Sequence, residues 1–249
     1  MLENGGRFRE NDLMPQARST LLSYAQLLRL PNVFTAVADP LAGWFVIGGG
    51  GDPQWQLPLL VGASGCLYLS GIVFNDCFDY TIDLVERPER PLPSGAIKRG
   101  TAWALGAVLM AAGLGLAAPV GKVAFSVAAF LAGMIFFYNS WARNIPGLRA
   151  LALGACRFTN FLLGMRCFPA RLVWFPAVIG LYAAGVTFLS RHEAGHPRLQ
   201  AAVKQLLLGI IVVDALLVAV SPMGDWIGAG LVLSLLVPAV VLGRVIAMT

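Results

Sequence analysis

The chain has 249 residues, of which 57% are hydrophobic and only 12% are charged, and its mean hydropathy is +0.73. These proportions exclude an ordinary water-soluble domain and are typical of a polytopic membrane protein. The net charge of +5 comes from arginines and lysines spread over several short loops, which argues against a nucleic-acid partner and for contact with anionic lipid of the bilayer.

Eight apolar segments are candidates for membrane-spanning helices. Their approximate bounds are residues 20–47, 56–80, 101–118, 122–138, 149–165, 171–190, 203–220 and 226–246. We therefore expect an all-α bundle of about eight transmembrane helices. Residues 1–18 are polar and are expected to be a cytoplasmic tail. Residues 19–249 would form one transmembrane domain, with halves at about 19–140 and 141–249.

The basic residues alternate sharply between the two sides of the predicted membrane. Fourteen lie on one side: Arg7, Arg9, Arg18, Arg29, Arg87, Arg90, Lys98, Arg99, Arg143, Arg149, Arg191, Arg198, Lys204 and Arg244. Only Lys122, Arg166 and Arg171 lie on the other side. Because positive residues are retained in cytoplasmic loops, both termini are expected in the cytoplasm. The protein would be a multi-pass protein of a bacterial-type inner (plasma) membrane.

The first predicted span contains a buried acid directly before a proline, Asp39-Pro40. Proline removes a helix hydrogen bond, so Pro40 is expected to kink the span. Asp39 could serve as a polar group of a substrate pocket, or it could bond the backbone amides at the kink. The residues alone leave both interpretations open.

The end of the second predicted span carries a ladder of oxygen-bearing side chains. Asn75, Asp79 and Asp83 are spaced i, i+4, i+8 and therefore share one helix face. Two carboxylates and an amide oxygen suit Mg²⁺, which completes its coordination with water and phosphate oxygens. Arg87 and Arg90 follow at once, and their guanidinium groups match phosphate geometry. The pattern predicts a metal-bridged diphosphate site at a membrane surface.

The alternative for this stretch is a helix end followed by a solvated charged loop. The functional interpretation is favoured because the acids begin inside the apolar span, where ionisable groups are costly. Asp76 lies about 100° around the helix from Asn75 and is a weaker candidate. In the loop RPERPLPSG, three prolines are expected to hold Arg87 and Arg90 over the site.

The pattern N-D-x-x-D-x-x-x-D followed by R-P-x-R-P-L-P-S-G, residues 75–95, resembles the UbiA family of membrane prenyltransferases. The resemblance implies a prenyl diphosphate substrate, a Mg²⁺ cofactor and an aromatic or quinone-like acceptor. Asn75, Asp79 and Asp83 would be the metal ligands, with Asp79 and Asp83 catalytic. The segment Tyr138–Met165 is similar to the EboC-like branch of this family. Aromatic walls would shelter the allylic cation, and the residues available are Phe34, Phe74, Phe78, Tyr138 and Tyr182.

Three further polar residues are candidates for substrate binding. Arg143 follows the fourth span, and the resemblance places it against the diphosphate, although a positive-inside anchor explains it equally well. Arg157 and Asn160 lie three apart inside the fifth span, so they share a face. Both are costly in lipid and are expected to point into the bundle, toward the acids or an anionic headgroup.

The second half of the chain repeats the first at an offset of 114 residues. The sequence LYxxGIxF at residues 67–74 matches LYxxGVxF at 181–188. Repeats of this kind place a shared site between the halves. At this offset Glu193 stands for Asp79, whereas Leu189 and Pro197 replace Asn75 and Asp83. UbiA-type enzymes resembling this chain carry a second aspartate-rich motif here, of which one acid remains.

This departure leaves two functions open. Glu193 could help a prenyltransferase to hold a metal or orient the acceptor. Alternatively, the protein could be a non-catalytic binder or export component for a prenyl or polyprenyl diphosphate lipid.

Residues 192–196, HEAGH, also match the H-E-x-x-H signature of zinc proteases. That motif needs a helix, so that both imidazoles meet on one face. Gly195 is a natural helix stop, and Pro197 disfavours a helical conformation at His196 and is expected to begin the next helix. An intramembrane zinc protease is therefore a remote alternative to a surface loop.

Overall fold

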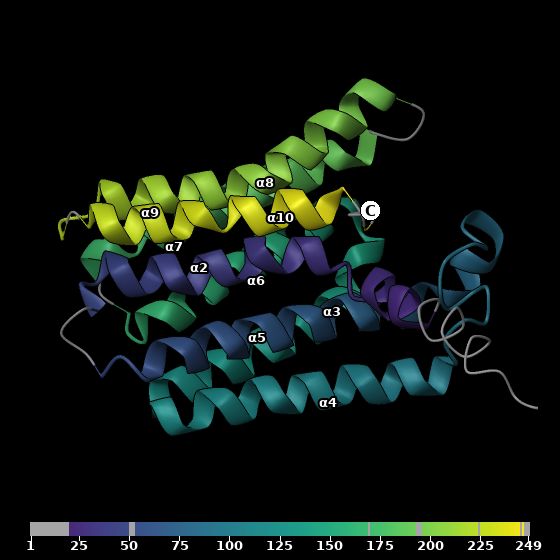
Figure 1. Cartoon of the computed structure of the whole chain (residues 1–249), viewed down its shortest axis with the longest axis horizontal. Coiled ribbons are helices and arrows are strands. Elements are labelled where there is room, and N and C mark those ends of the chain that lie inside the picture. The colour runs from purple at the N-terminus through teal and green to yellow at the C-terminus, as the bar shows by residue number, and fades with distance from the viewer. Residues whose placement is uncertain are drawn as a thin grey trace, which may run out of the picture.

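The computed structural model describes residues 20–49, 53–168, 170–192, 196–223, 225–244 and 246. Within these ranges the chain is helical with short turns and contains no strand. The helices lie side by side along the long axis of the molecule (Figure 1). The predicted all-α bundle is confirmed. The predicted cytoplasmic tail, residues 1–18, lies outside the described residues.

The helical elements follow one another in two halves of similar make-up. In the first half, residues 20–27 are helical and are followed by η1 (Leu30–Asn32), α2 (Val33–Val46), α3 (Gln56–Glu86), α4 (Arg99–Ala117), η3 (Ala118–Val120) and α5 (Lys122–Ser140). The second half contains η4 (Ala142–Asn144), α6 (Pro146–Met165), η5 (Ala170–Leu172), α7 (Trp174–Leu189), η6 (Ser190–His192), α8 (Pro197–Ala219), α9 (Trp226–Ser234) and α10 (Leu236–Gly243).

Six helical stretches of the described chain are long and apolar enough to cross a membrane. The other two predicted spans correspond to α2, which has only 14 residues, and α6, which contains Arg149 and Arg157. Helix α3 has 31 residues and is therefore about 46 Å long, at about 1.5 Å per residue. Because the apolar layer of a bilayer is only about 30 Å thick, one end of α3 extends beyond it.

The first predicted span, residues 20–47, is not continuous. The helix of residues 20–27 ends in a turn where Arg29 is left-handed, with φ 44°. Pro31 then lies in the short helix η1, before α2 begins at Val33. The break follows from Pro31, which has no N–H to donate to the preceding turn and clashes with it. Pro40, at which we expected a kink, lies inside α2, and the helix continues to Val46.

The last predicted span is also divided. Helix α9 ends at Ser234, and α10 begins at Leu236. Pro238 lies four residues after Ser234, so it has no N–H to donate to the Ser234 carbonyl. This missing hydrogen bond accounts for the division into two short helices. By contrast, α8 begins at Pro197 in its first turn, as the sequence predicted.

Two glycines allow α2 and α6 to approach closely. A Cβ atom on Gly43 of α2 would collide with the carbonyl oxygen of Phe161, and one on Gly164 of α6 would collide with the backbone of Pro40. Helix α2 also packs against α3, α8 and α9. The close crossing brings the polar residues of α2 and α6 into direct contact.

The loop after α3 is fixed to the bundle by two apolar side chains. Leu92 and Ile97 are 3% exposed and belong to a small buried cluster that includes Leu27 and Val73. The Ile97 amide donates a hydrogen bond of 3.0 Å to the Pro91 carbonyl. This loop and residues 20–32 lie at the same end of the bundle, on the right in Figure 1.

Candidate functional site

A cavity of about 550 Å³ lies inside the bundle, between helices of both halves. It receives side chains from η1, α2, α3, α5, α6, α7 and α8. Its lining includes eight of the nine residues selected from the sequence, namely Asn75, Asp79, Asp83, Arg87, Arg90, Arg143, Arg157 and Asn160. The ninth, Glu193, lies outside the described residues. Residues that are more than 80 positions apart in the chain thus line the same cavity.

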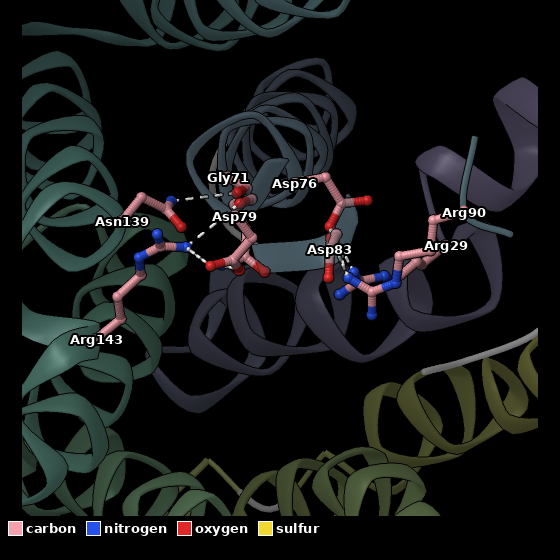
Figure 2. A network of polar contacts seen from close by, with 9 residues as sticks. Arg29, Gly71, Asp76, Asp79, Asp83, Arg90, Asn139 and Arg143 are labelled. Carbon is pink, nitrogen blue, oxygen red and sulfur yellow. Dashed lines mark hydrogen bonds and ion pairs between the residues drawn. The ribbon is translucent and has the colours of Figure 1, made fainter. Parts of the chain in front are cut away.

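The first half of the ladder is joined to the second half of the chain by an arginine. The Asn75 side-chain amide donates a hydrogen bond of 3.1 Å to Asp79. One Arg143 nitrogen lies 2.5 Å from the other Asp79 oxygen and also donates to the Asn75 backbone carbonyl at 3.4 Å. Figure 2 shows Arg143 reaching Asp79 from the turn after α5. Since the Asn75 nitrogen donates to Asp79, its side-chain oxygen is left as an acceptor.

The second part of the ladder faces two other arginines. Arg90 donates to Asp83 at 2.8 Å and lies 3.7 Å from Asp76. Arg29 donates to Asp76 at 2.6 Å. In Figure 2 this group lies to the right of Asp79, whereas Arg143 approaches Asp79 from the left. Together with the Asp79–Arg143 pair, these contacts bring three acids and three arginines together around the later part of α3.

Arg157 and Asn160 lie deeper in the bundle than the ladder. Arg157 donates to the Thr35 carbonyl at 2.7 Å, to its hydroxyl at 2.8 Å and to Asp39 at 3.2 Å. Asn160 donates to the same Asp39 oxygen at 2.8 Å. The Arg157 Cζ atom lies 5.7 Å from the centre of the Tyr68 ring. Along α3, Tyr68 precedes Asn75, the first ladder residue, by a rise of about 10 Å.

The side chains that donate hydrogen bonds to Asp39 therefore come from α6. It is fully buried, and one of its oxygens accepts from both Arg157 and Asn160. The sequence left two interpretations open for Asp39, a bond to the backbone at the kink and a place in the wall of the substrate pocket. The contacts support neither of them. Asp39 instead orients the two side chains that line it.

Several residues of the site were missed or underrated by sequence reasoning. The sequence marks Arg29 only as a membrane-side charge and places Asp76 off the ladder. Their contact depends on the turn at residues 28–32, inside what was predicted as one span. Asn139 donates to the Gly71 carbonyl at 3.2 Å across the α5–α3 contact. Its place in the segment YNSWAR was the only available signal.

The aromatic lining also differs from the prediction. Tyr138 lines the cavity, together with Tyr68, which was not selected. Phe74 and Phe78 instead pack around Trp103, with ring centroids 5.4 and 5.1 Å away. Helical periodicity placed all of these residues in spans, but only the packing of α3 against α4 decided which face was covered.

The second half contributes hydroxyl groups rather than carboxylates to the described lining. Thr187 of α7 and Ser190 of η6 border the cavity. In the described part of the chain no group of three or more His, Cys, Asp or Glu side chains is placed to hold a metal ion. The acid of the H-E-x-x-H match lies at residue 193, outside the described residues.

Comparisons with known proteins agree on one family. Residues 36–249 match the sequence profile of the UbiA prenyltransferase family. The digeranylgeranylglyceryl phosphate synthase of Methanosarcina mazei is 28% identical over 174 residues, which cover 65% of this chain and 60% of the relative. That of Sulfolobus acidocaldarius is 32% identical over 127 residues, covering 51% and 44%. The chain thus matches about half of the length of these curated relatives.

Two solved structures share the fold. A structure of digeranylgeranylglyceryl phosphate synthase aligns with a TM-score of 0.62 and 19% identity, covering 89% of this chain and 94% of that one. A UbiA homologue from Archaeoglobus fulgidus bound to DMAPP and Mg²⁺ aligns with a TM-score of 0.63 and 14% identity, covering 89% and 87%.

Proposed function

The chain belongs to the UbiA prenyltransferase family, and we propose that it transfers a prenyl group from a membrane-borne prenyl diphosphate to a lipid-soluble acceptor. One observation carries the proposal. Carboxylates of α3 and arginines from two separate loops border one cavity whose walls also include Ile72, Leu131 and Leu207. Charged groups and apolar walls in the same cavity match a diphosphate and its isoprenoid chain.

The donor set on α3 fits magnesium. Asn75, Asp79 and Asp83 all border the cavity and offer oxygen ligands from one face of α3. The Asp79 side chain is 25% exposed, so an ion has access to it. Mg²⁺ binds through one or two carboxylates together with water and phosphate oxygens. When bound, the ion would neutralise the diphosphate and stabilise the charge that develops on the leaving pyrophosphate. The homologue solved with DMAPP and Mg²⁺ supports this assignment.

The arginines of this chain would bind and orient the phosphates. Arg143 is held by the Asn75 carbonyl and lies 5.8 Å from the Phe78 ring, and Arg90 is held by Asp83. Arg87 is exposed at the rim of the cavity. Guanidinium groups already fixed in place lose little side-chain freedom when they receive an anion. We propose Arg87, Arg90 and Arg143 as the phosphate clamp.

In the reaction, the bond between C1 of the prenyl chain and oxygen breaks, and its electron pair leaves with pyrophosphate. A nucleophile of the acceptor then forms a bond to C1 and loses its proton. Tyr138 and Tyr68 supply aromatic faces in the cavity that can stabilise positive charge on the allylic carbon. Glu193 is proposed to orient the acceptor. Arg157 and Asn160 would line the inner part of the substrate channel.

Two classes of acceptor molecule are compatible with the proposed reaction. The names of the curated relatives favour a hydroxyl of a glycerol phosphate lipid. The motif resemblance had instead implied an aromatic or quinone-like acceptor, and the segment Tyr138–Met165 favours the EboC-like branch within the family. We propose the glycerol phosphate lipid as the first acceptor to test.

A second function, binding of the lipid diphosphate without turnover, is favoured by one observation. Where α3 supplies carboxylates, the polar groups that the described part of α7 and η6 brings to the cavity are the hydroxyls of Thr187 and Ser190. A site with one acidic wall binds one metal readily but leaves less charge for a second.

The deciding experiment is turnover by the purified protein in lipid nanodiscs. Radiolabelled geranyl or geranylgeranyl diphosphate is supplied with Mg²⁺ and with geranylgeranylglyceryl phosphate or a phenolic acceptor. Transfer of label to either acceptor, lost on chelation of Mg²⁺, would support the enzyme and identify the acceptor class. Tight binding without transfer would support the binder. The absence of both binding and transfer would contradict both functions.

We also propose that the acidic end of the cavity faces the cytoplasm of a bacterial-type plasma membrane, with residues 19–249 forming a single domain. Arg29, Arg90 and Arg143 all lie at that end in the structure, which supports the orientation given by the positive-inside rule (Figure 2).

A further inference from the structure

A second pair of carboxyl groups lies inside the bundle, away from the diphosphate end. Asp39 of α2 and Asp214 of α8 are both 0% exposed. Helix α2 packs against α8, and the two carboxyl groups interact with each other. Neither acid borders the cavity, and the proposed reaction does not use Asp214.

The two acids have different partners. One oxygen of Asp39 accepts from the Arg157 guanidinium at 3.2 Å and from the Asn160 amide at 2.8 Å. Neither oxygen of Asp214 accepts a hydrogen bond from a donor group of the described residues, and the same holds for the second oxygen of Asp39. Two ionised carboxylates cannot hydrogen bond to each other, because both only accept. Their contact is favourable only if one of them carries a proton.

The charges around the pair support the same conclusion. The charged and titratable groups that face it are Arg157 from α6 and Tyr68 from α3, besides the acids of α2 and α8. Arg157 contributes one positive charge. If Asp39 and Asp214 were both ionised, the buried group would have a net negative charge within the membrane. An uncompensated charge of this kind is strongly unfavourable.

We propose that Asp39 and Asp214 share a single proton, carried by Asp214. Asp39 is the ionised member because it accepts from a cation and an amide. Asp214 then donates its O–H to the free Asp39 oxygen, and every charge in the group is balanced. The resulting neutral group joins α2, α6 and α8 in the apolar interior. It holds Arg157 against Tyr68 and Asn160 against the backbone of Ala36, at the wall of the cavity.

Asp39 and Asp214 are therefore positioning residues for two groups that border the substrate channel. This role in catalysis rests on the proposed function, whereas the protonation of Asp214 can be tested without any substrate. Failure of one is thus distinguishable from failure of the other.

The direct test is infrared spectroscopy of the full-length protein in lipid nanodiscs. A protonated carboxyl group has a C=O band that is separate from those of carboxylates and shifts on H/D exchange. We expect this band in the wild type, its loss in Asp214→Asn and its retention in Glu89→Gln, which changes an exposed acid of the loop after α3. In Arg157→Leu, Asp39 should also take up a proton, and the band should roughly double. Absence of the band, or its survival in Asp214→Asn, would overturn the proposal.

The matched amide variants provide a second, functional test. An amide at residue 214 can donate to Asp39 as a protonated carboxyl does, so Asp214→Asn should retain thermal stability and the KM for geranyl diphosphate. Asp214→Leu removes the donor, and Asp39→Asn removes the counter-charge of Arg157, so both should lower the Tm and raise KM. The reverse order, with Asp39→Asn tolerated and Asp214→Asn not, would place the proton on Asp39 and contradict the assignment.

Discussion

The Arg143 guanidinium lies 2.5 Å from the Asp79 carboxylate, although the two residues belong to different halves of the chain. The contact joins the turn between α5 and α6 to the end of α3. A helix bearing the acidic ladder would therefore not form the site by itself, because the opposing cation comes from the second half. This relationship gives different expectations for the removal of the acid and of the base.

Removal of the acid should strongly weaken metal-dependent binding. The substitution Asp79→Ala removes the central ligand of the ladder. We expect the affinity for geranyl diphosphate in the presence of Mg²⁺ to fall about 10- to 100-fold, because a hydrogen bond to a charged group contributes about 1.5–3 kcal/mol. The variant should remain folded in the membrane, since this residue lies at the cavity surface. Equilibrium binding in nanodiscs measures the effect, with Glu89→Gln as control. Unchanged affinity in a folded Asp79→Ala protein would refute the site.

Removal of the base should affect phosphate binding and metal binding differently. Arg143→Gln takes away a phosphate donor but also releases Asp79 from its ion pair. We expect pyrophosphate to bind about tenfold more weakly, a loss of about 1.4 kcal/mol, while Mg²⁺ alone binds no more weakly than to the wild type. Calorimetric titration with each ligand separately provides the measurement. A parallel loss of both affinities would mean that Arg143 organises the whole site rather than the phosphate.

The broken second motif predicts a single strong metal site. A second Mg²⁺ needs more hard oxygen ligands than one carboxylate supplies. Titration in the presence of pyrophosphate should show one tight ion, removed by Asp83→Ala, with only a modest loss of diphosphate binding in Glu193→Ala. If Glu193→Ala costs as much as Asp79→Ala, the second half is a full partner in the chemistry, and the non-catalytic alternative is disfavoured.

The crossing of α2 and α6 should tolerate no side chain at Gly164. A Cβ there would overlap the backbone of Pro40, which cannot move aside as a flexible side chain could. We expect Gly164→Ala to destabilise the protein by about 1–3 kcal/mol or more. Gly133 of α5 has no atom within 4 Å of its would-be Cβ, so Gly133→Ala should be neutral or slightly stabilising. Thermal unfolding of the two variants side by side makes the comparison, and equal Tm values would contradict the close crossing.

The orientation can be tested with a reporter fused after Thr249. The eight crossings predicted from the sequence would return the chain to the side on which it began, and the positive-inside rule predicts that this side, with fourteen basic residues, is cytoplasmic. The reporter should therefore be active in the cytoplasm. A signal from the opposite side would indicate that one of the predicted spans, with α2 and α6 the first to suspect, does not cross.

Local chemistry explains the parts of the site that the sequence predicted. The spacing of Asn75, Asp79 and Asp83 depends only on the period of one helix, so it was readable before any tertiary contact was known. Arg87 and Arg90 follow within a few residues on the same segment, and the structure places them at the same cavity. The helix break at Pro31 was harder to predict, because apolar residues continue on both sides of it.

Sequence alone determined that this is a helical membrane protein, that Asn75, Asp79 and Asp83 share one face of one helix, and that the second half lacks two of the three matching groups. Tertiary structure decided which charges meet. Asp76 pairs with Arg29 because the chain turns before η1, and Asp39 meets both Arg157 and Asp214 because α2, α6 and α8 cross at particular faces. Hydropathy records how apolar a helix is, whereas the faces that meet depend on close contacts such as those at Gly43 and Gly164. Those contacts join residues too far apart in the chain for any local pattern to record them.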